Sequence, residues 1–326
     1  MKPLRFLATS LSLALVSAGA AGACSATKGA GHEFSAGTGG TGGATSATGA
    51  GDSGTGGSGQ GGESFFDAGF GGSGQGGSAP GCAQETQFIY TLAADTTLSR
   101  FDPPTLTFTT IGLLNCPNVF ASPFSMAVDR NAQAWVVFTD GTLARVDTKT
   151  AKCTPTSFVP GQSGFTTFGM GFSSNAPGSA EETLFVSESS FGGSTLGLAT
   201  IDVKTLKLTP VGQYDKVNAR AEMTGTGDAR LFAAFEGTPY NVAQIGKTDA
   251  KVLMQAPQGA INYAPGSSNF AFAFWGGDFW LFVGPGSSTD VFQYKPVTGV
   301  TTKVSSTAAE IVGAGVSTCA PTKPPG

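Results

Sequence analysis

Histidine is almost absent from this sequence of 326 residues, in which His32 stands alone. Because His32 lies in a glycine-rich stretch, we expect no histidine in any folded site. That absence excludes Ser-His-Asp and Cys-His nucleophilic devices. It also excludes histidine-based zinc, copper and non-haem iron sites, and we expect neither a metal nor a cofactor.

Charged residues and helical periodicity are scarce as well. Asp, Glu, Lys and Arg make up 12% of the chain, about half of the usual share. A net charge of -4 offers nothing that would attract nucleic acid. No segment keeps apolar residues at helical spacing, and no glycine-rich segment has the strand–GxxxxGK[ST]–helix form of a phosphate loop.

Residues 1–23 have the features of a lipoprotein signal peptide. Lys2 and Arg5 precede an apolar run that is too short and too rich in small residues for a retained membrane helix. The segment ends Ala21-Gly22-Ala23-Cys24, which resembles the bacterial lipobox, although Ala21 stands where Leu or Val is usual. The resemblance implies lipid attachment at Cys24, which anchors a protein without spanning the bilayer. The alternative is cleavage at an A-x-A-like site with Cys24 unmodified.

Residues 24–81 are predicted to form a disordered tether. Between Gly29 and Gly81 there are 22 glycines in 53 residues, interleaved with Ser, Thr and Ala. So little apolar surface does not offset the entropy of the chain. A flexible chain of this length reaches about 40 Å on average. One island, Glu63 to Phe70, carries three phenylalanines, and we interpret it as a sticky spot in the tether rather than a docking motif.

Residues 82–321, followed by a tail at 322–326, read as an all-β array. Short apolar runs alternate with turns rich in Gly, Pro, Asn and Asp. Five segments of similar shape follow one another, with central apolar residues 45, 55, 44 and 49 residues apart. That spacing is typical of the four-stranded blade of a β-propeller. The central residues are Phe101, Val146, Ile201, Ile245 and Tyr294.

An inner strand is predicted at the start of four repeats, where a large residue precedes a small one. The pairs are Met126-Ala127, Met170-Gly171, Met223-Thr224 and Phe272-Ala273. We interpret the methionines as core filler between blades. The first repeat lacks such a strand, and Ile311 to Val316 can supply it from the C-terminus. The sequence therefore predicts a five-bladed propeller closed by its last strand, with six blades as the alternative if the long third repeat hides further strands.

Four cysteines remain once Cys24 is set aside, which in an exported domain favours two disulfides with three candidate pairings. Cys82 precedes the second strand of the first blade, and Cys319 follows its presumed inner strand. A Cys82–Cys319 bond would lock the ring where no peptide does, with a nominal stabilisation of roughly 4–5 kcal/mol. Cys116–Cys153 follows by elimination and would tie the first two blades. Mass mapping would contradict the scheme by finding Cys82 joined to Cys116.

The repeats resemble those of a family of bacterial lipoproteins. The segments Pro123 to Arg130, Thr224 to Phe232 and Phe272 to Asp278 look like blade motifs of lipoproteins from myxobacteria and related bacteria. That resemblance extends over essentially the whole chain and implies a lipobox, a Gly/Thr/Ser tether and a propeller-like domain. It transfers no active site. Since propellers host enzymes, lectins and scaffolds alike, the fold does not choose a function.

Carboxylates carry the one enzyme class left open, because two of them can cleave a sugar bond without histidine. Asp129, Asp228 and Asp278 stand where hairpins should turn, which is an ordinary position for Asp. We therefore interpret these three as turn residues. Glu222 adjoins Met223, where it is expected to face solvent at a strand end, and is the catalytic candidate. Oxygen ligands could also hold calcium, although no spacing resembles a calcium loop.

Aromatic side chains are the alternative source of function, because exposed rings stack on sugars or anchor protein partners. Trp135 and Trp280 lie inside predicted strands and are expected in the core. Tyr240 and Tyr263 stand in Pro- and Gly-containing segments, and Trp275 adjoins Gly276-Gly277. These three are the predicted ligand contacts.

The sequence thus predicts an exported, monomeric lipoprotein that is lipid-anchored to the bacterial envelope, at the outer membrane. Its propeller would bind an envelope protein or a polysaccharide without catalysis. The alternative is a carboxylate-dependent glycoside hydrolase or lyase, and a third reading is a structural surface protein without a specific ligand. Glu222→Gln would leave binding intact in the first case and abolish turnover in the second.

Overall fold

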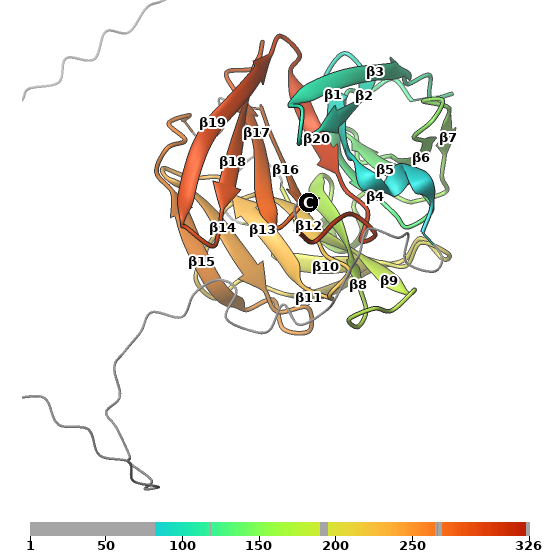
Figure 1. The fold of residues 1–326 in the computed structure, drawn as a ribbon. Coiled ribbons are helices and arrows are strands. Elements are labelled where there is room, and N and C mark those ends of the chain that lie inside the picture. The colour runs from blue at the N-terminus through green and yellow to red at the C-terminus, as the bar shows by residue number, and fades with distance from the viewer. Residues whose placement is uncertain (1–81, 118, 190–194, 265, 267–268, 324–326) are drawn as a thin grey trace, which may run out of the picture. The chain divides into compact units, whose positions relative to one another are not determined.

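A computed structural model describes residues 82–323 apart from residues 118, 190–194, 265 and 267–268 (Figure 1). The predictions for Cys24, His32 and the tether therefore lie outside the described residues. Within the part of the chain that is described, none of the helices has the length and apolarity needed to cross a bilayer.

The described chain forms five four-stranded antiparallel sheets arranged in a ring (Figure 1). Two short 3-10 helices, η1 (Gln84–Gln87) and η2 (Gln162–Gly164), lie outside the sheets. From the inner to the outer strand, the sheets are β20 (Ile311–Gly315), β1 (Ile89–Ala93), β2 (Thr97–Asp102) and β3 (Thr107–Leu113); β4 (Pro123–Val128), β5 (Gln133–Phe138), β6 (Leu143–Asp147) and β7 (Cys153–Pro155); β8 (Phe168–Ser174), β9 (Glu182–Glu188), β10 (Leu198–Ile201) and β11 (Leu208–Gly212); β12 (Ala221–Gly225), β13 (Leu231–Phe235), β14 (Tyr240–Ile245) and β15 (Val252–Gln258); and β16 (Asn269–Trp275), β17 (Asp278–Gly284), β18 (Thr289–Lys295) and β19 (Val300–Thr307).

The five-bladed propeller predicted from the repeats is confirmed, and the six-bladed alternative is wrong. Each predicted central residue, from Phe101 to Tyr294, lies on the third strand of its sheet. The extra length of the third repeat forms the connection between β7 and β8, which carries η2, and the connection between β9 and β10. Long connections therefore account for that spacing, and no sixth sheet forms among the described residues.

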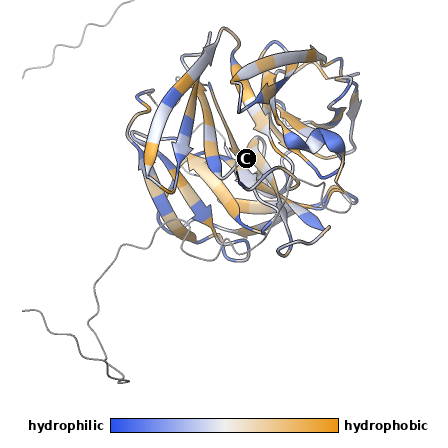
Figure 2. Ribbon diagram, in the orientation of Figure 1, coloured by the Kyte–Doolittle hydropathy of each residue, from blue (hydrophilic) through white to orange (hydrophobic). Residues whose placement is uncertain are grey.

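Burial falls from the inner strands toward the outer ones. The innermost strands β8, β12 and β16 are buried along their whole length, whereas β3 and β19 on the rim are mostly exposed or half-buried. Hydrophobic colours accordingly dominate strands such as β13, while hydrophilic segments appear on the outer strand β15 (Figure 2). Apolar side chains of adjacent sheets form clusters that include Met126, Met170 and Met223, as expected of core filler.

Glycine lets neighbouring inner strands approach backbone to backbone. A Cβ added at Gly169 in β8 would lie 2.0 Å from the Ala221 carbonyl oxygen in β12. One added at Gly225 in β12 would lie 2.2 Å from the Phe172 carbonyl oxygen. Since backbone atoms cannot yield to such a contact, a larger residue here would force the blades apart. Small residues at the axis are thus what allow five sheets to close.

The C-terminal strand closes the ring as predicted. β20 pairs with β1 in antiparallel register, with Thr91 opposite Ala314. A disulfide joins Cys82 to Cys319, across a sequence separation of 237 residues. A second disulfide joins Cys116 to Cys153, beside a bridge between Asn115 and Lys152. Both predicted pairings are present in the structure.

The two ends of the ring differ in what covers them. We call the end where the inner strands begin the upstream end, and the end where they finish the downstream end. The segment after β20 crosses the downstream end: Gly276 N–H donates to the Pro321 carbonyl, and a Cβ at Gly227 would lie 2.4 Å from the Thr318 carbonyl oxygen. The chain enters the first blade at this same end, through Cys82.

Candidate functional site

A pocket of about 510 Å³ lies at the upstream end of the ring. Its wall comes from the first residues of the inner strands and from the connections beside them, so all five blades contribute. The lining residues that matter for its chemistry are Phe124, Thr139, Arg220, Glu222, Phe270 and Glu310. Concave sites of about 300–1,000 Å³ are the usual size for small ligands. The propeller therefore presents a ligand-sized hollow at one end of its axis.

Glu222 is the most unusual group in the pocket. It is the second residue of β12 and is only 3% exposed, although it lines the pocket. The Ser125 hydroxyl on β4 donates a hydrogen bond to Glu222 Oε2 over 2.6 Å. Burial raises the pKa of Glu222 to about 8, against the opposing effects of Ser125 and Arg220. At neutral pH this carboxyl group is therefore mostly protonated.

Arg220 stands at the wall of the pocket but is engaged by another carboxylate. Its guanidinium forms a two-point ion pair with Glu236, in which one nitrogen–oxygen distance is 2.7 Å. The same guanidinium lies over the Phe270 ring, 5.3 Å from its centroid. Glu236 also accepts a hydrogen bond from the Gly266 N–H. The pair thus braces one side of the pocket, and the positive charge of Arg220 is largely compensated.

Glu222 differs from the sequence-based expectation in one respect. It is not at a solvent-facing strand end, because β12 enters the ring beside β8 and β16 and buries the side chain against β4. Its selection as the catalytic candidate nevertheless falls on a pocket residue. Whether it acts on a ligand is a separate matter, which the arrangement alone leaves to experiment.

The three aspartates behave as the turn residues they were predicted to be. The Asp129 carboxylate accepts hydrogen bonds from the N–H groups of Asn131 and Gln133. Asp228 pairs with Arg230 within the turn between β12 and β13, and Asp278 accepts from the Gln293 amide. All three lie in or beside hairpins at the downstream end, away from the pocket.

The predicted aromatic ligand contacts do not line the pocket. Tyr240 begins β14 and is 0% exposed, with its ring edge-on to Phe270, so its predicted exposure is wrong. Trp275 does end a strand, but it is only 7% exposed, and its indole donates to the Gln87 carbonyl over 2.7 Å. Tyr263 is half-buried and donates to Asp290. Core packing and hydrogen bonding use these rings instead. Trp135 and Trp280 are in the core as predicted.

Sequence reasoning missed Ser125, Phe124, Arg220, Phe270 and Glu310. The repeat alignment contained the signal that could have found them. Each of them lies within three residues of the start of an inner strand, and equivalent positions in a ring of blades converge on one end of the axis.

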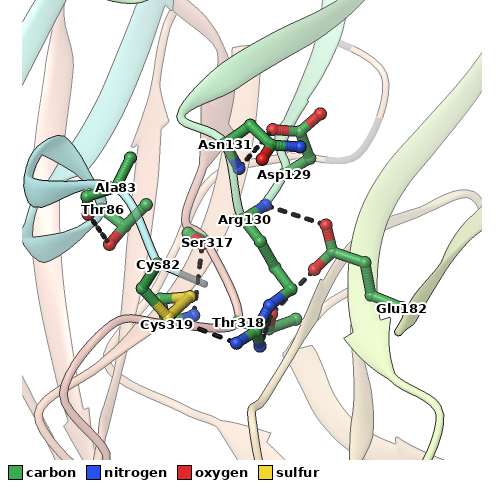
Figure 3. Close-up of a disulfide and its surroundings, with 10 residues drawn as sticks. All are labelled: Cys82, Ala83, Thr86, Asp129, Arg130, Asn131, Glu182, Ser317, Thr318 and Cys319. Carbon is green, nitrogen blue, oxygen red and sulfur yellow. Dashed lines mark hydrogen bonds between the residues drawn. A yellow bond between two sulfur atoms is a disulfide. The ribbon is translucent and has the colours of Figure 1, made fainter. Parts of the chain in front are cut away.

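A second titratable cluster lies at the downstream end beside the ring-closing disulfide (Figure 3). Glu182 accepts from the Arg130 N–H over 2.8 Å and from the Thr318 hydroxyl over 2.7 Å. The Arg130 guanidinium in turn donates to Thr318 and toward Cys82 Sγ. Burial raises the pKa of Glu182 to about 7. These contacts hold the closing segment in place, and none of these residues lines the pocket.

No cluster of three or more His, Cys, Asp or Glu side chains suited to a metal ion occurs among the described residues. The chemistry of the pocket is consequently that of hydroxyl, carboxyl and aromatic groups. Such groups can hold a small polar ligand, and a protonated carboxyl can also donate a proton.

Comparison with known proteins finds no matching family model and no matching curated protein. Solved structures with some similarity include the Dos1 propeller, at 16% identity and a TM-score of 0.38, over 63% of this chain and 52% of that one. Another is the extracellular domain of a protein described as a one-component system from B. thetaiotaomicron, at 15% identity and a TM-score of 0.36, over 71% of this chain and 30% of that one. The chain thus spans about half of the first neighbour and less than a third of the second. Function has to be argued from the residues of the site.

Proposed function

We propose that this chain is an exported lipoprotein whose propeller binds a sugar unit of an envelope or extracellular polysaccharide in the upstream pocket. The observation that carries the proposal is the pocket itself, which places carboxyl groups and phenylalanine rings around a ligand-sized hollow. A sugar unit offers hydroxyl groups beside apolar C–H faces. Glu222, Glu310 and Thr139 supply polar partners for the hydroxyls, while Phe124 and Phe270 supply aromatic surface for the C–H groups.

A pocket of this size favours a glycan over a protein as ligand. Stable protein interfaces bury about 800 Å² on each partner and centre on exposed aromatic anchors. The rings predicted for that role, Tyr240 and Trp275, are in the core instead. A hollow of about 510 Å³ suits a small polar unit such as the end of a glycan chain.

The polysaccharide proposal is tested with the full chain in detergent, immobilised and exposed to purified exopolysaccharide and envelope extract of the producing bacterium. Glu310 lines the pocket, and we expect Glu310→Gln to weaken glycan retention at least tenfold, because it removes a carboxylate acceptor for ligand hydroxyls. Glu181→Gln is the matched control, since Glu181 is exposed at the downstream end.

Equal glycan retention by the two variants would place binding elsewhere on the molecule. Retention of a defined protein without any glycan would replace the proposal with a protein-binding function.

The anchoring part of the proposal rests on Cys24 and on the two disulfides, which are typical of domains that fold outside the reducing cytosol. We expect Cys24→Ser to move the protein from the membrane fraction to the soluble fraction, because serine has no thiol to accept a lipid. Fractionation and the intact mass of the wild-type protein measure this. A wild-type mass without lipid, or an unchanged distribution of Cys24→Ser, would refute lipid anchoring at this residue.

A second candidate function is glycan cleavage, and the protonation of Glu222 is the observation that favours it. A carboxyl group whose pKa is raised to about 8 inside a pocket has the property required of a general acid. The retention experiment separates the two candidates when the bound glycan is analysed for length. Shortened chains that disappear with Glu222→Gln would establish cleavage, and intact chains would count against it.

A further inference from the structure

Glu222 is the one charged residue in the five inner strands, all of which the structure describes. Strands β4, β8, β16 and β20 contain no Asp, Glu, Lys, Arg or His, and β12 contains Glu222 alone. β13, the other strand that pairs with β12, has no charged residue either. A carboxyl group at this position is therefore surrounded by apolar and hydroxyl side chains at close range. Such surroundings penalise the ionised form.

Charged groups at the edge of the pocket do not offset this penalty. Arg220 is the nearest cation and is engaged by Glu236. Glu310 enters the pocket from the connection before β20 and carries the same charge sign as an ionised Glu222. Glu188 ends β9 and accepts a hydrogen bond from the Leu196 N–H. Tyr240, on β14, is buried. Around Glu222 there is thus one compensated cation and a surplus of acidic groups.

We propose that Glu222 meets the ligand as an uncharged carboxylic acid, so that the pocket selects uncharged, oxygen-rich sugar units over sugar units that carry an ammonium group. This inference rests on the proposed glycan-binding function and adds the chemical class of the unit that is bound. Ser125 donates to one carboxyl oxygen, Oε2, so the acid proton on the other oxygen is the hydrogen-bond donor offered to the ligand. Ether, hydroxyl and amide oxygens of a sugar unit accept such a bond.

The shift in pKa supports the same assignment. With a pKa of about 8, Glu222 remains mostly protonated at neutral pH. An ammonium ligand would require the carboxylate and would have to remove that proton. An uncharged ligand uses the group as it stands, and its affinity should change only when the pH rises through the region of 8.

The experiment compares two hexasaccharide probes that differ only in the charge of one substituent. These are the fully N-acetylated chito-oligosaccharide and its de-N-acetylated form, which carries ammonium groups below its amine pKa. Binding to the full chain in detergent is measured at pH 6 and at pH 9. We expect the wild type to bind the N-acetylated probe at least tenfold more tightly than the ammonium probe at pH 6.

Two variants show which form of Glu222 is used. Glu222→Ala removes the donor, and we expect it to bind the N-acetylated probe at least tenfold more weakly than the wild type. Glu222→Gln restores an uncharged donor of similar shape, and we expect its affinity at pH 6 to return to within threefold of the wild-type value. Its affinity should also lack the change that the wild type shows between pH 6 and pH 9. Preference for the ammonium probe, or equal losses in the two variants, would overturn the proposal.

A measurement without ligand keeps the proposal testable should the alanine variant fold poorly. The infrared difference between the wild type and Glu222→Gln at pH 7 should contain the carbonyl stretch of a protonated carboxyl group. Its absence would overturn the proposal whatever the probes do. Its presence, together with failure of both probes to bind, would support the charge assigned to Glu222 and count against the glycan-binding function.

Discussion

Replacing Cys82 and Cys319 together by serine is expected to lower the free energy of unfolding by about 5 kcal/mol. The disulfide closes a loop of 237 residues, and in the chain-entropy model the stabilisation grows with the logarithm of loop length. A loss of this size removes a large part of the stability of an ordinary domain, which is about 5–15 kcal/mol. Denaturant titration under non-reducing conditions measures it.

The second disulfide provides the matched control. Cys116 and Cys153 close a loop of only 37 residues, so their replacement by serine is expected to cost less, about 4 kcal/mol. The location of the damage separates the pairs further. Only the Cys82 and Cys319 replacement should speed amide hydrogen exchange in β20 and β1, because those strands form the seam of the ring. Unchanged protection of β20 would show that hydrogen bonds and packing alone hold the seam.

Replacing Glu222 by glutamine is expected to stabilise the protein by about 5 kcal/mol above pH 8 and to have little such effect below pH 4.5. The pKa of Glu222 is raised from 4.5 to about 8 in the folded chain. As the pH rises between these values, the unfolded chain loses the proton while the folded chain keeps it, so wild-type stability falls. Above pH 8 the loss is complete, at about 1.4 kcal/mol for each pKa unit between the two states.

Glutamine carries no ionisable proton and therefore escapes this decline. Denaturant titrations from pH 4 to pH 9 should show the two proteins diverging as the pH rises. Glu181→Gln removes the same charge from an exposed position, and we expect it to follow the wild type. Parallel curves for Glu222→Gln and the wild type would mean that Glu222 ionises freely inside the ring.

The architecture was readable from the sequence because each blade repeats one local pattern. The spacing of Phe101, Val146, Ile201, Ile245 and Tyr294 gave the number of blades, since each of these residues occupies the third strand of its sheet. The missing inner strand of the first repeat identified the closing strand. Once that strand was placed, Cys82 and Cys319 had to lie near each other.

The site was harder to predict, because exposure depends on the neighbouring blade and not on the local sequence. A Pro- or Gly-containing segment suggested that Tyr240 was free, yet Phe270 of the next blade covers its ring. Glu222 was expected at a solvent-facing strand end, yet Ser125 on β4, which lies in another sheet, contacts it across the axis. The identity of a repeat position predicts its strand, whereas its environment is set by tertiary packing.

The covalent seam also determines how the ring responds to mechanical force. Any pull transmitted along the preceding chain reaches the propeller at Cys82, just ahead of β1. Without the bond to Cys319, that tension would peel β1 from β20 one residue pair at a time, starting at the downstream end. With the bond in place, the load passes to the far side of the seam before any hydrogen bond is strained. A propeller tethered at this point resists shear through a sulfur–sulfur bond rather than through its weakest row of pairs.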